Sequence, residues 1–438
     1  MGNKLDLYFF ERLKANRFFK SVMIVKVFME RRYYMLEYAY FLLVNPLFGY
    51  IVYSLMSMVL FLFVIRTSYI NRWQNIFLSH PVGHRDTLPI AVLIPNRNEA
   101  TIDKTLQSIM GQTKKPEHVI IVFNNMTDNG YSYNLAQNIL KHSSLNYTLL
   151  VMEDNPYLKS GALNFGYSWL IKNLNCDKID YICQMDSDSE LEPHFLERTY
   201  GGMEASPEIG ALSSCFEGKK KLLEKKKIIY LLQNFEYIKY HNSQIMKQVS
   251  VISGTGNLLR IDALQEIERE FGMVWDIHSI VEDYTLTIRL KMLNWATLKS
   301  TKFIVYTDLM PSIKLLIYQR LRWQRGTFDT LFKHGINKTT IREYLKEIKY
   351  FSMTAIEIGI YFVLVNGVVY YDFGNLSIIY FAIPLVIISI YNLYYLRDYQ
   401  LINILLVICF LPIVLYNLLR TFWWMWSLLT VRTKKWSE

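Results

Sequence analysis

Short apolar runs alternate with helical patterns in the middle of the chain, between residues 88 and 310. The runs "LPIAVLIP" (88–95), "HVIIVFN" (118–124) and "DYICQMD" (180–186) have the length and composition of buried strands. The segments "EATIDKTLQSIMGQ" (99–112) and "SGALNFGYSWLIKNL" (160–174) instead carry apolar residues at helical spacing. This alternation predicts an α/β domain, with a mixed, mainly parallel sheet and flanking helices.

Each predicted strand ends in a polar turn. The three turns are "PNRNE" (95–99), "NNMTDNG" (124–130) and "DSDSE" (186–190). Ligands of such sheets bind at the carboxyl ends of the strands. We therefore expect the three turns to converge on one crevice.

The third turn places Asp186 and Asp188 one residue apart. Alternate side chains of an extended segment point the same way, so both carboxylates could reach one divalent cation. The alternative is a solvated acidic turn. Glu190 and Glu192 are expected to cap or solvate the helix that follows.

Long uncharged runs outside the central region predict transmembrane helices. Residues 36–66 contain the uncharged run from Tyr38 to Ile65, which is long enough to cross a bilayer core of ~30 Å. Residues 350–431 contain three, or four, further transmembrane or interfacial helices, with candidate runs at 351–371, 373–396 and 399–419. The aromatic segment 421–431 either extends the last span or lies in the interface.

The net charge of +10 accompanies 52% hydrophobic and 15% aromatic residues. Basic residues cluster in the segment 1–35, which is either interfacial or hides a further span, and in "KKKLLEKKK" (219–227). Because these clusters adjoin apolar segments, membrane lipids are the expected partner and nucleic acid is not. The four cysteines show no paired spacing, which indicates reduced thiols and no zinc site.

Four motifs occur in the order typical of one family. They are "KSGALN" (159–164), the Asp186/Asp188 pair, "VED" (281–283) and "QRLRW" (319–323). In this order the chain resembles membrane-embedded family 2 glycosyltransferases, the group that includes cellulose, chitin, hyaluronan and poly-N-acetylglucosamine synthases. The resemblance runs from about residue 89 to 335. It implies a GT-A type glycosyltransferase domain at 88–310, inserted between transmembrane and interfacial helices.

The resemblance assigns catalytic roles to the carboxylates. Asp188, with Asp186 beside it, would hold Mg²⁺ or Mn²⁺ against the diphosphate of a UDP-sugar. Asp283 would be the general base that activates the acceptor hydroxyl, and Glu282 would support it. Val281 stands where the family usually has Thr. The alternative for Asp283 is that it caps the following helix.

Residues 311–349 are expected to form interfacial amphipathic helices. Gln319, Arg322 and Trp323 share one helical face, and by resemblance the first two bind the diphosphate while Trp323 forms a floor for the acceptor sugar. Leu315 and Leu316 are expected to lie against lipid. The alternative is a basic interfacial helix in which Arg320 and Arg325 reach the headgroups.

The remaining site residues come from loops. Pro95, Asn96 and Glu99 would line the nucleotide, and Asn125 stands where many relatives carry an Asp that contacts uracil. Lys159 would approach the phosphates, unless it is a solvated loop lysine. Thr255 and Asn257, in "SGTGN" (253–257), would meet the acceptor, unless this segment is a plain turn.

The sequence thus predicts an integral plasma membrane protein with a cytosolic catalytic domain. Its expected activity is that of a processive, inverting glycosyltransferase that extends a polysaccharide from a UDP-sugar and assists its translocation. One alternative is a non-processive enzyme that adds one sugar to a lipid or glycan acceptor, and a remote one is a non-catalytic scaffold of the same fold. The chain has few predicted transmembrane helices to form a polysaccharide channel by itself, so a homo-oligomer is a further alternative.

Overall fold

The structure is a computed structural model that describes residues 69–83, 86–174, 178–243, 248–349, 401–408 and 411–432, with single residues between 55 and 66 and at 351, 390 and 393. The chain divides into two compact units. Nearly all described residues belong to the unit of Leu62–Ile356 and Ser389–Glu438. Among them, no helix combines the length and the apolarity needed to cross a membrane. The predicted spans at 36–66, 351–371 and 373–396 lie largely outside the described residues.

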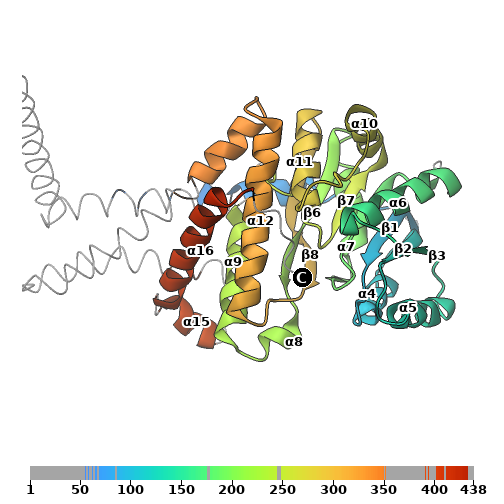
Figure 1. Cartoon of the computed structure of the whole chain (residues 1–438), viewed down its shortest axis with the longest axis horizontal. Helices are drawn as coiled ribbons and strands as arrows, with labels where there is room; N and C mark the ends of the chain where they lie inside the picture. The colour runs from blue at the N-terminus through green and yellow to red at the C-terminus, as the bar shows by residue number, and fades with distance from the viewer. Residues whose placement is uncertain are drawn as a thin grey trace, which may run out of the picture. The chain divides into compact units, whose positions relative to one another are not determined.

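The described unit is built on one mixed sheet (Figure 1). In spatial order its strands are β3 (Tyr147–Met152), β2 (Lys115–Asn124), β1 (Thr87–Asn96), β4 (Tyr181–Gln184), β7 (Asn257–Arg260), β6 (Ile209–Gly218), β8 (Ala296–Thr307) and β5 (Glu190–Leu191). The first four run parallel, β7 is antiparallel to β4 and β6, and β6 pairs parallel with β8. The predicted mixed, mainly parallel sheet is confirmed.

The helices connect the strands and cover both faces of the sheet. They are α4 (Ile102–Met110), α5 (Tyr131–Lys141), α6 (Leu158–Asn173), α7 (Phe195–Met203), α8 (Lys220–Leu223), α9 (Ile228–Ser243), α10 (Ile261–Phe271), α11 (Glu282–Met292), α12 (Ile313–His334), α15 (Leu401–Ile408) and α16 (Leu411–Leu429). One core contains residues of α4, α5 and α7, and the other contains residues of α6, α10 and α11.

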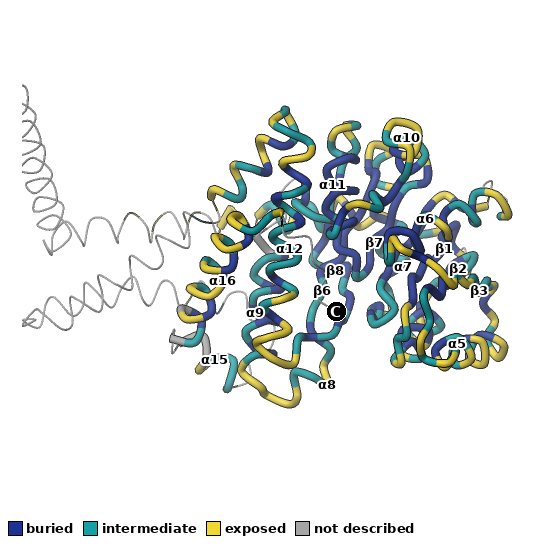
Figure 2. Tube along the Cα trace, viewed as in Figure 1, coloured by how far each residue is buried: buried dark blue, intermediate teal, exposed yellow. Residues whose placement is uncertain are grey.

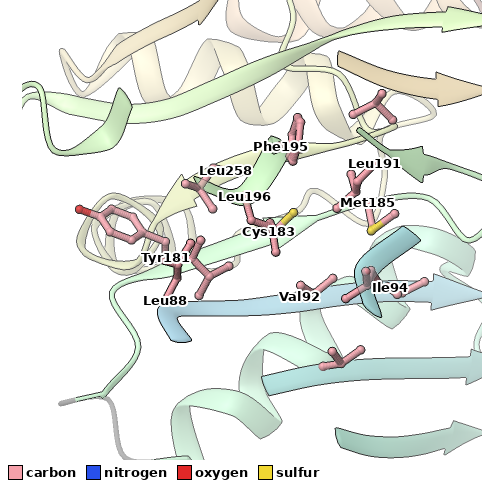
Figure 3. Close-up of a cluster of buried hydrophobic side chains, with 14 of the residues drawn as sticks. Leu88, Val92, Ile94, Tyr181, Cys183, Met185, Leu191, Phe195, Leu196 and Leu258 are labelled. Carbon is pink, nitrogen blue, oxygen red and sulfur yellow. The ribbon is translucent and has the colours of Figure 1, made fainter. Parts of the chain in front are cut away.

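The alternation along β1 divides the apolar residues between these two cores. Leu88, Val92 and Ile94 belong to the core beneath α4 and α7, where they lie near Cys183 of β4 (Figure 3). Leu93 belongs to the opposite core. Because successive strand side chains point to opposite faces, a sheet covered on both sides needs an apolar run without interruption. Figure 2 shows the resulting buried sheet and the more exposed outer helices.

Helices α9, α12 and α16 pack together beside the sheet (Figure 1). Leu316 of α12 is buried against Tyr416 and Trp423 of α16. The prediction that Leu316 faces lipid is therefore wrong, because the C-terminal helix covers that position. Leu315 is 47% exposed.

Candidate active site

The loops after β1 and β2 are tied to each other. The side-chain amide of Asn124 donates to the carbonyl of Asn96 at 2.8 Å. Asn98 donates to the Thr127 hydroxyl at 2.6 Å and accepts from the Thr127 backbone N–H at 2.8 Å. Asn98 adopts a φ of 56°, a conformation that asparagine tolerates better than most residues. The predicted convergence of these strand ends is thus observed, and Asn98, which carries it, was not singled out from the sequence.

Asp186 and Asp188 lie in the turn that follows β4, and not on the strand itself. The expectation that strand alternation positions the two side chains is wrong, because β4 ends at Gln184. The charge of Asp186 nevertheless acts on Asp188. The turn is instead held by the Ser189 N–H, which donates to the Asp186 carbonyl at 3.2 Å, and by the Thr105 hydroxyl, which donates to the Ser187 carbonyl at 2.7 Å.

Lys159 joins two of the predicted motifs. Its Nζ lies 2.6 Å from Asp186 Oδ1 and 2.7 Å from Glu282 Oε1. Burial lowers the pKa of Lys159, but the charges of Asp186, Glu282 and Asp283 outweigh burial and raise that pKa above its ordinary value. Lys159 is therefore a charged group at the centre of the site, near the start of α6, and not a solvated loop lysine.

Asp283 lies in the first turn of α11 and faces the loop 253–257. Its carboxylate accepts from the Tyr284 N–H at 2.7 Å and from the Gly254 N–H at 3.3 Å. A Cβ built on Gly254 would lie 2.8 Å from Lys159 Nζ and 3.7 Å from Asp283 Oδ2, so the absence of a side chain lets this loop approach the charges.

The pKa values of the two carboxylates of "VED" shift in opposite directions. Burial raises the pKa of Asp283 to about 6, and the adjacent Glu282 charge acts in the same direction. Burial would also raise the pKa of Glu282, but the Lys159 charge and hydrogen bond, with Arg322, lower it. Asp283 is therefore the carboxylate suited to accept a proton near neutral pH.

Asp188 is the second carboxyl group with a raised pKa. Burial raises the pKa of Asp188 to about 7, and the charges of Asp186, Asp308 and Glu99 add to that effect. The charge of Lys219 lowers the pKa of Asp188 and so opposes this rise. Lys219 Nζ itself forms ion pairs, 3.1 Å from Asp308 Oδ1 and 3.4 Å from Glu190 Oε1. Two expectations are corrected here: Lys219 serves this carboxylate group and not lipid, and Glu190 pairs with Lys219 and does not cap α7. Glu192 does accept from the His194 N–H at the start of α7, at 3.1 Å.

Helix α12, which carries "QRLRW", brings Arg322 to the carboxylates of "VED". Arg322 Nη1 donates to the carbonyl of Ile280 at 3.2 Å, directly before "VED". Its charge lowers the pKa of both Glu282 and Asp283. Trp323 packs in the same cluster as Val281.

Arg320 does not reach a membrane surface. Its guanidinium is buried, 2.8 Å from Glu236 Oε2 of α9, and it donates to Gln319 Oε1 at 3.2 Å. The alternative of a headgroup-seeking Arg320 is therefore wrong, because a buried acid on a neighbouring helix binds it. Arg325 donates to the hydroxyl of Thr430 at 2.9 Å.

The other predicted binding residues lie near this centre with their own partners. Asn125 donates to the Asn155 carbonyl at 2.7 Å and accepts from its N–H at 2.8 Å. Glu99 accepts from the Thr101 hydroxyl at 2.7 Å. Pro95 lies in β1 directly before Asn96, whose buried side-chain amide has no protein partner.

The predicted acceptor residues belong to the loop that faces Asp283. Thr255 and Ser253 share a hydrogen bond between their hydroxyls at 2.6 Å. Asn257 is buried and donates to the Ser253 carbonyl at 2.8 Å. These bonds lie within the loop, and the Gly254 N–H bond joins the loop to Asp283. Contact of Thr255 and Asn257 with an acceptor stays a prediction.

Taken together, the predicted acids and the cations beside them form one partly buried group of charges: Asp186, Asp188, Glu282, Asp283, Lys159, Lys219 and Arg322. Such an arrangement can bind a diphosphate through its cations and can remove a proton from a hydroxyl through Asp283. Within the described ranges, no three His, Cys, Asp or Glu side chains gather as a metal cage.

Comparison with known families agrees with this geometry. The profile of glycosyl transferase family 2 matches residues 91–268, and that of glycosyl transferase family group 2 matches residues 181–433. Both contain the Asp186/Asp188 turn, and the second also contains "VED" and "QRLRW".

Curated relatives are distant and match only part of their own length. The probable glucomannan 4-beta-mannosyltransferase 15 of Arabidopsis thaliana is 21% identical over 270 residues, which are 60% of this chain and 48% of that protein. The probable glucomannan 4-beta-mannosyltransferase 14 of the same plant is 30% identical over 189 residues, 40% of this chain and 32% of that protein. The chain therefore matches about half, or less, of the length of these relatives.

A solved structure shares the fold. It is the mannosyltransferase PcManGT of Pyrobaculum calidifontis in complex with GDP-Man and Mn²⁺, which superimposes with a TM-score of 0.52 at 12% identity and covers 86% of this chain and 98% of its own. At that identity the likeness concerns the fold, which is of the GT-A type.

Proposed function

The chain belongs to glycosyl transferase family group 2, and we propose that it transfers a hexose from a nucleoside diphosphate sugar to an acceptor hydroxyl, with inversion at the anomeric carbon. The observation that carries this proposal is the position of Asp283. It is a partly buried carboxylate with its pKa raised to about 6, and it accepts from the Gly254 N–H beside the Lys159–Glu282 pair. A base of this kind is suited to hydroxyl activation near neutral pH.

In this proposal Asp283 takes the proton as the acceptor oxygen bonds to the anomeric carbon, while the bond to the diphosphate breaks on the opposite face. Glu282 does not take the proton. Lys159 lowers the pKa of Glu282, so this carboxylate stays ionised and holds Lys159 in an ion pair. Lys159 and Arg322 lie where they would meet the negative charge that develops on the leaving diphosphate.

A divalent cation fits the Asp186 and Asp188 turn. Burial raises the pKa of Asp188 to about 7, and the charges of Asp186, Asp308 and Glu99 act in the same direction while Lys219 opposes them. Magnesium sites commonly use one or two carboxylates and complete their coordination with substrate phosphates. The residues that would hold Mg²⁺ or Mn²⁺ are thus Asp188 and Asp186, and the ion would supply Lewis-acid stabilisation of the diphosphate.

For the donor we propose GDP-mannose before a UDP-sugar. The curated relatives named above are mannosyltransferases, and the solved structure of this fold holds GDP-Man. The sequence-based expectation of UDP came from the family resemblance, and Asn125, which replaces the Asp that contacts uracil in many relatives, already weakened it. In the structure both ends of the Asn125 amide are paired with the Asn155 backbone. A UDP-sugar remains the second candidate.

For the product we propose a polysaccharide, made at the plasma membrane with the catalytic unit in the cytosol. Support comes from the uncharged runs at 38–65 and 373–396, from the "QRLRW" motif, and from relatives named as glucomannan synthesising enzymes. Addition of one sugar to a lipid or glycan acceptor is the alternative, and product length separates the two.

The test is a donor panel. Full-length protein in detergent or nanodiscs receives GDP-mannose, GDP-glucose, UDP-glucose, UDP-N-acetylglucosamine and UDP-glucuronate with Mn²⁺, and both nucleotide release and product size are measured. We expect release with GDP-mannose and a product cleaved by β-mannanase. Release with a UDP-sugar alone would overturn the donor assignment, and no release with any donor would overturn the transfer activity.

A further inference from the structure

Glu236 collects partners from two other helices in a buried position. Its Oε2 accepts from Arg320 Nη2 of α12 at 2.8 Å and from the Tyr416 hydroxyl of α16 at 2.5 Å. Its Oε1 lies 3.2 Å from Arg420 Nε, also of α16. One carboxylate of α9 therefore joins the motif helix to the C-terminal helix.

Arg320 in turn contacts two residues of the "QRLRW" motif. Its guanidinium donates to Gln319 Oε1 at 3.2 Å, and its Cζ lies 4.5 Å from the centre of the Trp323 indole. On the other side it lies 5.3 Å from the ring centre of Tyr237. The arginine thus contacts two aromatic rings and forms an ion pair with Glu236.

These contacts fix the orientation of both motif side chains. Arginine has only donors, so the Gln319 amide must turn its oxygen toward Arg320 and its NH₂ group away from it. A cation over the indole is attracted by the negative ring face, which holds the plane of Trp323. Sugars are bound by such means, through amide hydrogen bonds to hydroxyls and through contact with a flat aromatic surface.

We propose that Arg320, held by Glu236, is a positioning residue for the acceptor sugar: it sets the Gln319 amide and the Trp323 ring, and α16 supports it through Arg420 and Tyr416. This rests on the proposed transferase function and adds to it two residues, Arg320 and Glu236, to which the resemblance gave no role. It also assigns Gln319 to the acceptor, whereas the resemblance placed it at the diphosphate. The ligand class is a hexose or hexose chain presenting hydroxyls to the amide and a ring face to the indole.

A different result is expected if the Arg320–Glu236 ion pair only stabilises the fold. Buried pairs can be replaced without loss of fold when packing is kept, whereas removal of one partner mainly lowers stability. In that case substitution would affect donor and acceptor equally. If Arg320 positions the acceptor site, its loss instead raises the acceptor KM and leaves the donor KM unchanged, and the effect becomes smaller once Trp323 is removed.

The experiment is a double-mutant cycle with the donor that the panel identifies. Arg320→Met, Arg320→Lys, Trp323→Ala and the double variant R320M/W323A are compared with wild type for donor KM, acceptor KM and thermal stability. Arg325→Met is the matched control, because Arg325 also joins α12 to α16, through Thr430. If Arg320→Met does not fold, Arg320→Lys, which keeps the charge but not the planar fork, takes its place.

We expect Arg320→Met to raise the acceptor KM roughly 2- to 30-fold, the range that a cation–π contact of this kind corresponds to. Arg320→Lys should recover part of this loss, and Arg320→Met should raise the acceptor KM by a smaller factor in the Trp323→Ala background than in wild type, because only its contact with Gln319 remains to be lost there. Additive effects, or an equal change in donor KM, would overturn the positioning role while the transferase function stands. A wild-type protein without transfer activity would overturn both.

Discussion

The side chain of Val281 lies directly against the backbone of Gly326. A Cβ built on Gly326 would fall 2.4 Å from Val281 Cγ2, which is closer than any real contact. Val281 precedes the catalytic pair of α11, and Gly326 lies on the motif helix α12. This contact therefore sets how closely the two motifs approach each other. Val281, which replaces the family's usual Thr, keeps an apolar contact with the helix at this point.

Gly326→Ala should destabilise the fold and slow transfer. The added methyl group overpacks a site that has no free space, at a cost of about 1–3 kcal/mol, and pushes α12 away from α11. Denaturant melts and kcat measure the two effects. Gly83→Ala is the control, because nothing lies within 4 Å of its added Cβ; equal behaviour of the two variants would contradict the close-contact role.

Asp283→Asn should abolish transfer and spare donor binding. The amide keeps the size of the side chain but cannot accept the proton, so we expect kcat to fall by roughly 10²–10⁴-fold. Nucleotide affinity, measured by calorimetry, should stay within a factor of a few. Turnover near the wild-type rate would show that another group is the base.

The pH dependence of kcat/KM should show an acidic limb near pH 6. Because the pKa of Asp283 is raised to about 6, the carboxyl group carries a proton below that pH and cannot accept another, so activity is lost as the pH falls and is full above it. A limb that persists unchanged in Asp283→Asn would assign it to another group.

Two substitutions should move this limb in opposite directions. Lys159 lowers the pKa of Asp283 and Glu282 raises it. Lys159→Met should therefore shift the limb to higher pH, and Glu282→Gln should shift it to lower pH. The pH–rate profiles of both variants, with a good donor at saturating metal, test this; shifts of the same sign would contradict the described charge arrangement.

Asp188→Ala should remove metal-dependent nucleotide binding. Calorimetric titration of the nucleoside diphosphate with and without Mn²⁺ should show a metal effect in wild type and none in the variant. Asp262→Asn, an exposed position on α10, is the control. An unchanged Mn²⁺ effect in Asp188→Ala would place the cation elsewhere.

Much of this fold could be predicted from the order of residues. The uninterrupted apolar runs of β1, β2 and β4 require a sheet covered on both faces, and polar turns at their ends mark a ligand edge. The motifs "VED" and "QRLRW" likewise made Asp283 and Arg322 candidates, because their order along the chain resembles that of one enzyme family.

Other features depended on which segments far apart in the chain come to lie together. Nothing in "KKKLLEKKK" shows that Lys219 differs from its neighbours, and only the packing of β5, β6 and β8 places it between Glu190 and Asp308. Arg320 in the sequence is a basic residue on an amphipathic helix, as suited to a lipid surface as to an ion pair. Only the presence of Glu236, on a helix 84 residues earlier, made it a buried charge.

The sequence alone therefore determined the sheet, the strand-end turns and the identity of the reactive groups, since local periodicity and residue chemistry are properties of short segments. The tertiary structure decided which cation pairs with which acid and which carboxyl pKa values rise, because burial and charge–charge distance exist only once the chain is folded.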